Sequence, residues 1–151
     1  MEPHRWWHAA ASVWLVNAQG QIMCSKRAPG LFGNSGKWQS YFGGHVSGGS
    51  TALETVRREL EEETGIVKPA DDFFLVQEKK NEEVKMHLAY YATRFDGQPS
   101  DLRFTDGEIT EAKWMDMDEY WSQKEKHPDA WCNRCTLEQQ AIIRQWLEST
   151  R

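Results

Sequence analysis

A glycine pair followed by an acidic helix constrains this chain more than any other sequence feature. The glycines end a short aromatic stretch, and apolar side chains at helical spacing then follow over residues 51–64. Such spacing predicts a helix with one buried stripe. Within it Glu59, Glu62 and Glu63 stand at i, i+3 and i+4, so the three carboxylates share one face. Ser50 is the expected N-cap.

Clustered carboxylates repel one another unless a cation lies between them. Oxygen ligands of this kind suit Mg²⁺ or Mn²⁺, and these ions in turn suit phosphate substrates. A solvated acidic helix face is the alternative, and it needs no ligand. The glycines favour a site, because Gly43 and Gly44 let the backbone approach a ligand closely. Arg58 can hold a carboxylate in place through a charge-assisted hydrogen bond.

The remaining elements predict a mixed sheet between helices. Apolar and alternating stretches predict strands, and Thr136 with Gln139 three residues later predicts a capping box that opens the last helix. The expected strands are residues 8–16, 21–26, 38–42, 73–79, 83–95 and 108–115, and the expected helices are 51–64, 116–122 and one from 136 through 145.

Length and charge exclude several classes of protein. The chain has 151 residues, without a repeat or a linker, which favours a single domain over residues 1–151. Its formal net charge of −5 disfavours binding to a nucleic acid polymer or an anionic membrane. No apolar run approaches the roughly 20 residues of a membrane span.

The three cysteines are too few for a disulfide framework and fit reduced thiols in the cytoplasm. Cys132 and Cys135 form a C-x2-C pair, which is half of a zinc site. A structural zinc ion needs four ligands and the sequence offers no second pair, so ordinary thiols are the simpler interpretation.

The acidic segment resembles the box of the Nudix hydrolase superfamily, G-x5-E-x7-R-E-U-x-E-E-x-G-U, where U is a bulky aliphatic residue. Ser50 replaces the first glutamate of the motif, and Ser47 replaces an acidic residue that many members carry after the glycines. The other positions match: Gly44, Arg58, Glu59, Leu60, Glu62, Glu63, Gly65 and Ile66.

The resemblance implies an α/β/α sandwich with a mixed central sheet and a loop-helix-loop box. It also implies metal-dependent hydrolysis of a nucleoside diphosphate linked to another moiety, such as a nucleoside triphosphate, a sugar nucleotide or a dinucleotide. Carried over by position, Glu62 and Glu63 are metal ligands, Glu59 is a ligand or the base for water, and Arg58 orients a glutamate. The Gly43 or Gly44 carbonyl completes the coordination of Mg²⁺ or Mn²⁺. Homodimers are common in the family.

Some residues outside the helix are further candidates. Family members often recruit one more acid from a loop, and Glu108 is the preferred candidate, with Glu111 behind it. Lys26 and Arg27 end an expected strand, where they could meet phosphate or simply be solvated.

Two other functions stay open. The places of His8 and His45 resemble metal-binding histidines of isopentenyl-diphosphate isomerases, but that branch has a catalytic cysteine where this chain has Gly43. Ser47 and Ser50 leave open a non-catalytic nucleotide-sensing module on the same scaffold, since one acidic position of the motif is missing.

Overall fold

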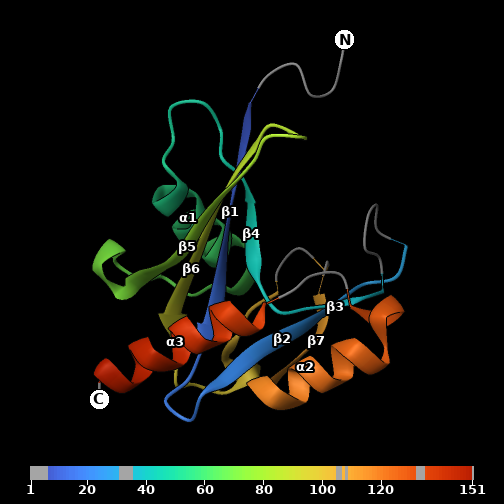
Figure 1. Cartoon of the computed structure of the whole chain (residues 1–151). Helices are drawn as coiled ribbons and strands as arrows, with labels where there is room; N and C mark the ends of the chain where they lie inside the picture. Colours follow the sequence, from blue (N-terminus) through green and yellow to red (C-terminus); the bar gives the residue numbers. More distant parts are fainter. Residues whose placement is uncertain (1–6, 31–35, 105–106, 108, 132–134, 151) are drawn as a thin grey trace.

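The computed structural model describes residues 7–30, 36–104, 107, 109–131 and 135–150. Within these residues seven strands form one mixed sheet, and three α-helices pack against it (Figure 1). The strands are β1 (His8–Val16), β2 (Gln21–Arg27), β3 (Trp38–Gln39), β4 (Phe42–His45), β5 (Phe73–Asn81), β6 (Met86–Arg94) and β7 (Ile109–Asp116), and the helices are α1 (Ala52–Thr64), α2 (Met117–Lys126) and α3 (Leu137–Ser149).

Strand β1 is the centre of the sheet. It runs parallel to β6 along its whole length and antiparallel to β4, which lies beside its first half. It meets β2 only near the hairpin at Val16, after which β2 diverges and pairs with β3 and β7. Strand β5 pairs with the outer side of β6. The expected mixed sheet between helices is confirmed.

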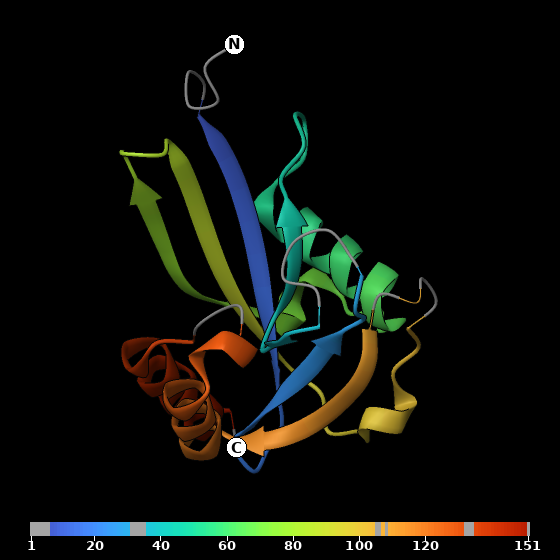
Figure 2. The ribbon, with the colours of Figure 1, turned by 90° about the vertical axis from the view of Figure 1, so that its right-hand side faces the viewer.

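Alternation along β1 divides the core into two halves. Val13 and Leu15 belong to a cluster with Val56 and Leu60 of α1. Trp14 belongs to a second cluster, which contains the buried side chains of α2 and α3. Figure 2 accordingly shows α1 (green) and α3 (red) on opposite sides of β1. All the candidate carboxylates of α1 are therefore on one side of the sheet.

The ends of α1 depend on local capping. The hydroxyl oxygen of Thr51, and not that of Ser50, accepts a hydrogen bond from the Glu54 amide at 3.1 Å, so the expected N-cap is shifted by one residue. At the other end Gly65 adopts a left-handed conformation (φ 80°), and its amide donates to the Glu61 carbonyl at 2.8 Å.

Of the six expected strands only the one at 8–16 has the expected limits; three others differ by one or two residues at an end, and two differ more. The stretch 38–42 is divided between β3 and β4, because the chain leaves its pairing with β2 after Gln39 and pairs with β1 from Phe42. Strand β6 starts at Met86 and not at residue 83. The preceding turn contains Lys85 at a positive φ of 52°, which a strand does not accommodate.

A buried polar group lies at the centre of the α2/α3 half of the core. The Tyr120 hydroxyl oxygen accepts hydrogen bonds from the Cys135 amide at 2.8 Å and from the Ser40 hydroxyl at 3.4 Å. Tyr120 therefore links the segment before β4 to the segment before α3. Burial raises the pKa of Tyr120 to about 12.

This core predicts a loss of stability in alkali. Burial raises the pKa of the Cys24 thiol and raises that of Cys135 to about 12, from an ordinary value of 9.0. The unfolded chain therefore loses these protons first, and the stabilisation is fully present below pH 9.0 and is lost as the pH rises toward 12. Each group that ionises only in the unfolded chain lowers the free energy of unfolding by about 1.4 kcal/mol per pH unit.

Urea unfolding at about pH 8 and about pH 10.5 measures this effect. The free energy of unfolding is expected to be lower at the higher pH, and the fall is expected to be shallower in a Cys24→Ala, Cys135→Ala double variant. An equal free energy of unfolding at both values in the wild-type chain would contradict the burial of these thiols.

Candidate functional site

Helix α1 presents its three glutamates at different depths. Val56 and Leu60 are fully buried against the sheet and fix the rotation of the helix. Glu59 and Glu63 stand one turn apart and are half-buried, whereas Glu62 is exposed. Two carboxylates are therefore held close to the sheet, and the third is at the solvent edge of the same helix.

The two half-buried carboxylates lie against the glycines of β4. The Gly43 amide donates a hydrogen bond to Glu63 Oε2 at 3.2 Å. A Cβ atom at position 44 would lie 2.9 Å from Glu59 Oε1, which is closer than real Cβ contacts allow. The absence of a side chain at Gly44 therefore lets the Glu59 carboxylate approach the strand.

The exposed glutamate lies beside an arginine of the same helix. Arg58 Nε is 4.0 Å from Glu62 Oε1, and both side chains are substantially exposed. A contact of this length at the surface contributes at most a few tenths of a kcal/mol. It orients Glu62 loosely, so the carboxylate can rotate on its side chain.

The donor chemistry of these residues fits a hard divalent cation. Within the described ranges no three His, Cys, Asp or Glu side chains converge closely enough to hold a metal ion. Glu59 and Glu63 nevertheless lie together against β4, where the missing Cβ at Gly44 lets the Glu59 carboxylate approach the strand and the Gly43 amide donates to Glu63. Oxygen ligands of this kind select Mg²⁺ or Mn²⁺ over softer metals.

The two basic residues at the end of β2 have different surroundings. Lys26 Nζ lies 3.9 Å from Glu111 Oε2 on β7, so Lys26 points to its neighbouring strand. Arg27 Nε is buried and has no hydrogen-bond partner in the described part of the chain. A buried donor without an acceptor is costly, and an anion bound there would satisfy it. Lys26 and Arg27 therefore differ in the structure, although the sequence pattern gives both the same expected role.

Glu108, and Glu111 behind it, are the candidates for the expected loop acid. Glu108 lies outside the described residues. Glu111, the second candidate for this role, is on β7 and is exposed beside Lys26.

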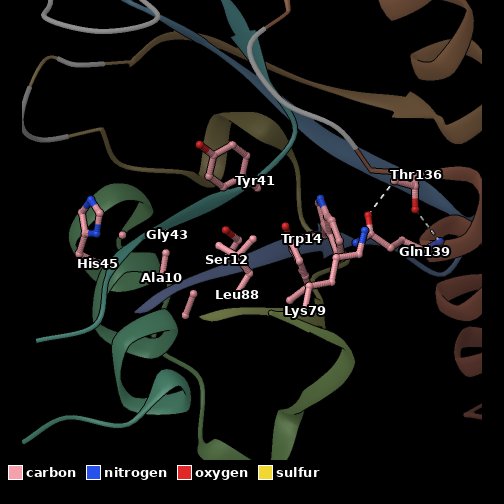
Figure 3. A pocket seen from close by; sticks show the side chains of 13 residues that line it. Ala10, Ser12, Trp14, Tyr41, Gly43, His45, Lys79, Leu88, Thr136 and Gln139 are labelled. Carbon is pink, nitrogen blue, oxygen red and sulfur yellow. Dashed lines mark hydrogen bonds between the residues drawn. The ribbon is translucent and has the colours of Figure 1, made fainter. Parts of the chain in front are cut away.

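A pocket of about 460 Å³ opens on the other side of the β4 glycines (Figure 3). Its floor is formed by β1 and β6, and its walls include Tyr41, Lys79 and Gln139. Gly43 and Gly44 line this pocket while they also contact the glutamates of α1. The glycine backbone is therefore the thin partition between the pocket and the carboxylates.

Sequence reasoning did not identify the far walls of this pocket. Lys79 comes from β5, and Thr136 and Gln139 come from the start of α3. The capping box of α3 is present as expected, because the Gln139 amide donates to the Thr136 hydroxyl at 3.1 Å. No local signal shows that this helix start lines the same pocket as β1, since this depends on the whole sheet order.

The two histidines singled out in the sequence border a second cavity, of about 510 Å³. His8 and His45 line it together with His87, Trp7 and the loop after β4. His45 belongs to both cavities, at the exposed end of β4.

Comparison with known families decides the assignment. The NUDIX domain model matches residues 6–137, which include β1, the β4 glycines, α1 and every strand of the sheet. The chain belongs to the Nudix family.

Among curated relatives, Nudix hydrolase 3 of Arabidopsis thaliana is 37% identical over 68 residues, which are 44% of this Nudix chain and 9% of that protein. The isopentenyl-diphosphate Delta-isomerase of Klebsiella pneumoniae is 29% identical over 117 residues, which cover 73% of this chain and 61% of the isomerase. The aligned part is thus less than two thirds of either relative.

Solved structures support the fold. DR0079 from Deinococcus radiodurans superposes with a TM-score of 0.70 at 18% identity, over 96% of this chain and 87% of that one. The NUDIX domain of Shewanella oneidensis NrtR, solved with ADP ribose, gives 0.62 at 14% identity, over 97% and 90% of the two chains. At these identities the likeness concerns the fold alone.

The β4 backbone approaches β1 closely at Gly43. A Cβ atom at position 43 would collide with the Ala11 carbonyl oxygen and would lie 2.8 Å from Ser12 Cα. In this sheet the position cannot carry a side chain unless the backbone of β1 or β4 shifts.

None of the described helices of this Nudix chain has the length and hydropathy needed to cross a membrane.

Proposed function

We propose that this Nudix domain is a metal-dependent hydrolase that cleaves a diphosphate bond in a nucleoside diphosphate linked to another moiety. One observation carries the proposal: the Glu59 and Glu63 carboxylates lie against a glycine backbone whose other side lines a pocket. This arrangement suits a diphosphate at the glycines with its remaining moiety in the pocket. Phosphoryl transfer depends mainly on positioning and on charge stabilisation, which such a site can provide.

The residues have distinct proposed roles. Glu59, Glu62, Glu63 and the Gly44 carbonyl would hold Mg²⁺ or Mn²⁺, which neutralises phosphate charge and lowers the pKa of water when it is bound. Arg58 positions Glu62, since the two side chains are neighbours on α1.

The base that takes the proton from the attacking water is Glu59 or Glu108 in this proposal. Glu59 is half-buried beside Gly44, so its carboxylate is close to where the substrate would enter. A base must lie within hydrogen-bond reach of the proton that it accepts.

The substrate is further proposed to be bound through Gly43, Gly44, Lys26 and Arg27. Arg27 is the better candidate of the two for binding phosphate, because its buried Nε has no partner in the described residues while Lys26 is near Glu111. A charge-assisted hydrogen bond to phosphate would satisfy that donor.

Replacing Arg27 with methionine tests this role. The KM for a diphosphate substrate is expected to rise about 10- to 100-fold, since a hydrogen bond to a charged group contributes about 1.5–3 kcal/mol. The free energy of unfolding is expected to stay the same or increase, because methionine leaves no buried donor unpaired. Lys26→Met should have a smaller effect on KM. An unchanged KM for Arg27→Met would contradict a phosphate at this side chain.

The ligand is proposed to be a small nucleotide, in line with the ADP ribose bound by the Shewanella NrtR domain. A single domain over residues 1–151, a homodimeric state and a cytoplasmic location complete the proposal. The free thiols of Cys24 and Cys135 are compatible with that location.

The isomerase relatives support a second candidate function, conversion of isopentenyl diphosphate. The closed position at Gly43 argues against it. A nucleotide-sensing module is the third possibility, in which Ser50 in place of the motif glutamate abolishes turnover.

A substrate panel separates these functions. Nucleoside triphosphates, sugar nucleotides and dinucleotides are incubated with the protein and Mg²⁺ or Mn²⁺, and the release of phosphate or pyrophosphate is measured. Turnover of one substrate class is expected. Binding without turnover across the panel would favour the sensing module.

A further inference from the structure

One row of side chains crosses the floor of the 460 Å³ pocket from β4 to β5. The strand register aligns His45 with Ala10, Ala10 with Leu88, and Leu88 with Lys79. All four residues line the pocket. Figure 3 shows His45 at one end and Lys79 toward the other, with Ala10 and Leu88 between them.

The length of this row determines how long a ligand the pocket can hold. His45 and Lys79 are three strand-to-strand steps apart. Neighbouring strands lie about 4.8 Å apart, so about 14 Å separates the two backbones. The small Ala10 leaves the middle of the floor open, and the long Lys79 side chain shortens the distance to be bridged. A ligand with its diphosphate at the glycines can therefore reach Lys79 with its far end.

Charge in this pocket differs from charge in the rest of the chain. The chain has 23 acidic residues, yet no Asp or Glu is among the described residues that line the pocket. Among the described residues that line the pocket, Lys79 is the only lysine or arginine. Within the described ranges Lys79 forms no ion pair. Lys79 is exposed, so the far end of the pocket offers one solvent-accessible positive charge for which the described residues provide no ion-pair partner.

The neighbouring lysine provides a contrast. Lys80 Nζ lies 3.8 Å from Glu82 Oε1 and 4.9 Å from the centre of the Trp7 ring, and it does not line the pocket. Adjacent residues of a strand point to opposite faces, so only Lys79 faces the ligand space.

The middle of the pocket is suited to a ring or another flat group. Trp14 and Tyr90 stack at 5.4 Å with an interplanar angle of 9°, and both line the pocket together with Tyr41. Aromatic walls bind flat groups well and leave the anionic ends to the polar residues.

We propose that Lys79 makes this site selective for diphosphate compounds that carry a second anionic group, a phosphate or a carboxylate, on the moiety that enters the pocket. The proposal rests on the proposed function only for the placement of the diphosphate at the glycines. The second anion pairs with Lys79 at the β5 end, and the body of the moiety lies over Leu88 and beside Tyr41.

Two pairs of probes test this selectivity, each differing by one anion. Adenosine 5′-diphosphate is compared with its 3′-phosphorylated form, and UDP-glucose is compared with UDP-glucuronate. Calorimetric Kd values are measured without added metal, so that hydrolysis is not part of the readout. Lys79→Met and the matched control Lys80→Met are measured beside the wild-type chain.

In wild type and Lys80→Met, the anion-bearing member of at least one pair is expected to bind about tenfold more tightly, and Lys79→Met is expected to lose this preference. The pair that shows the preference identifies the anion as phosphate or carboxylate. Absence of a preference in both pairs, or a preference that persists in Lys79→Met, would overturn the proposal. The binding preference is measured separately from hydrolysis, so a failed hydrolase assay would not change the conclusion about Lys79.

Discussion

Replacing Glu62 with glutamine is expected to lower kcat at least about 100-fold with little change in stability. The proposed site needs charged oxygens around its cation, and removing one group that stabilises developing charge typically costs about 10²–10³ in rate. Glu62 is exposed, and its one ion pair with a described residue is the 4.0 Å contact with Arg58, so the fold should tolerate the change. Steady-state kinetics and urea unfolding measure the two effects separately.

Glu61→Gln is the matched control for this experiment. Glu61 is the preceding residue of α1, is exposed, and lies outside the face that carries Glu59, Glu62 and Glu63. Its substitution makes the same chemical change at a neighbouring surface position and should leave kcat within about twofold. Equal activity of Glu62→Gln and Glu61→Gln would contradict the role of the acidic face.

Replacing Gly43 with alanine is expected to destabilise the fold by about 3 kcal/mol, near the upper end of typical overpacking costs. The new methyl group would meet the backbone of β1 at Ala11 and Ser12, and backbone atoms cannot rotate away as a flexible side chain can. The same shift would move the amide that donates to Glu63. Urea denaturation gives the change in free energy of unfolding.

Gly48→Ala is the control for a general cost of losing glycine. Gly48 is in the loop between β4 and α1, and a Cβ placed there would have no described residue within 4 Å apart from its own chain neighbours. The free energy of unfolding should change by no more than about 0.5 kcal/mol. A Gly43→Ala variant as stable as Gly48→Ala would contradict the close approach of β4 to β1 at this position.

Local features of this chain could be predicted from its sequence. The C-terminal cap at Gly65 and the capping box of Thr136 and Gln139 depend only on residues within one helical turn, so pattern and propensity suffice. The N-cap shows the limit of this reasoning. Ser50 and Thr51 are adjacent hydroxyl residues with similar preferences, and only the observed hydrogen bond of Thr51 distinguishes them.

Long-range features could not be predicted in the same way. The sequence gives no indication that Lys26 pairs with Glu111 while Arg27 Nε has no hydrogen-bond partner among the described residues, because this depends on β7 lying beside β2. Lys79 reaches the pocket through the order of four strands, from β4 to β5. The motif thus predicts where the carboxylates lie, and the sheet determines what faces them.

Incorporation of solvent oxygen tests the central claim most directly. The substrate selected by the panel is incubated with the protein in water enriched in oxygen-18, with Mg²⁺ or with a chelator, and the products are analysed by mass spectrometry. The proposed hydrolase is expected to place a single oxygen-18 in a phosphate product, in the presence of the metal only. Unlabelled and uncleaved compounds throughout the panel, or isopentenyl diphosphate converted with its diphosphate intact, would contradict it.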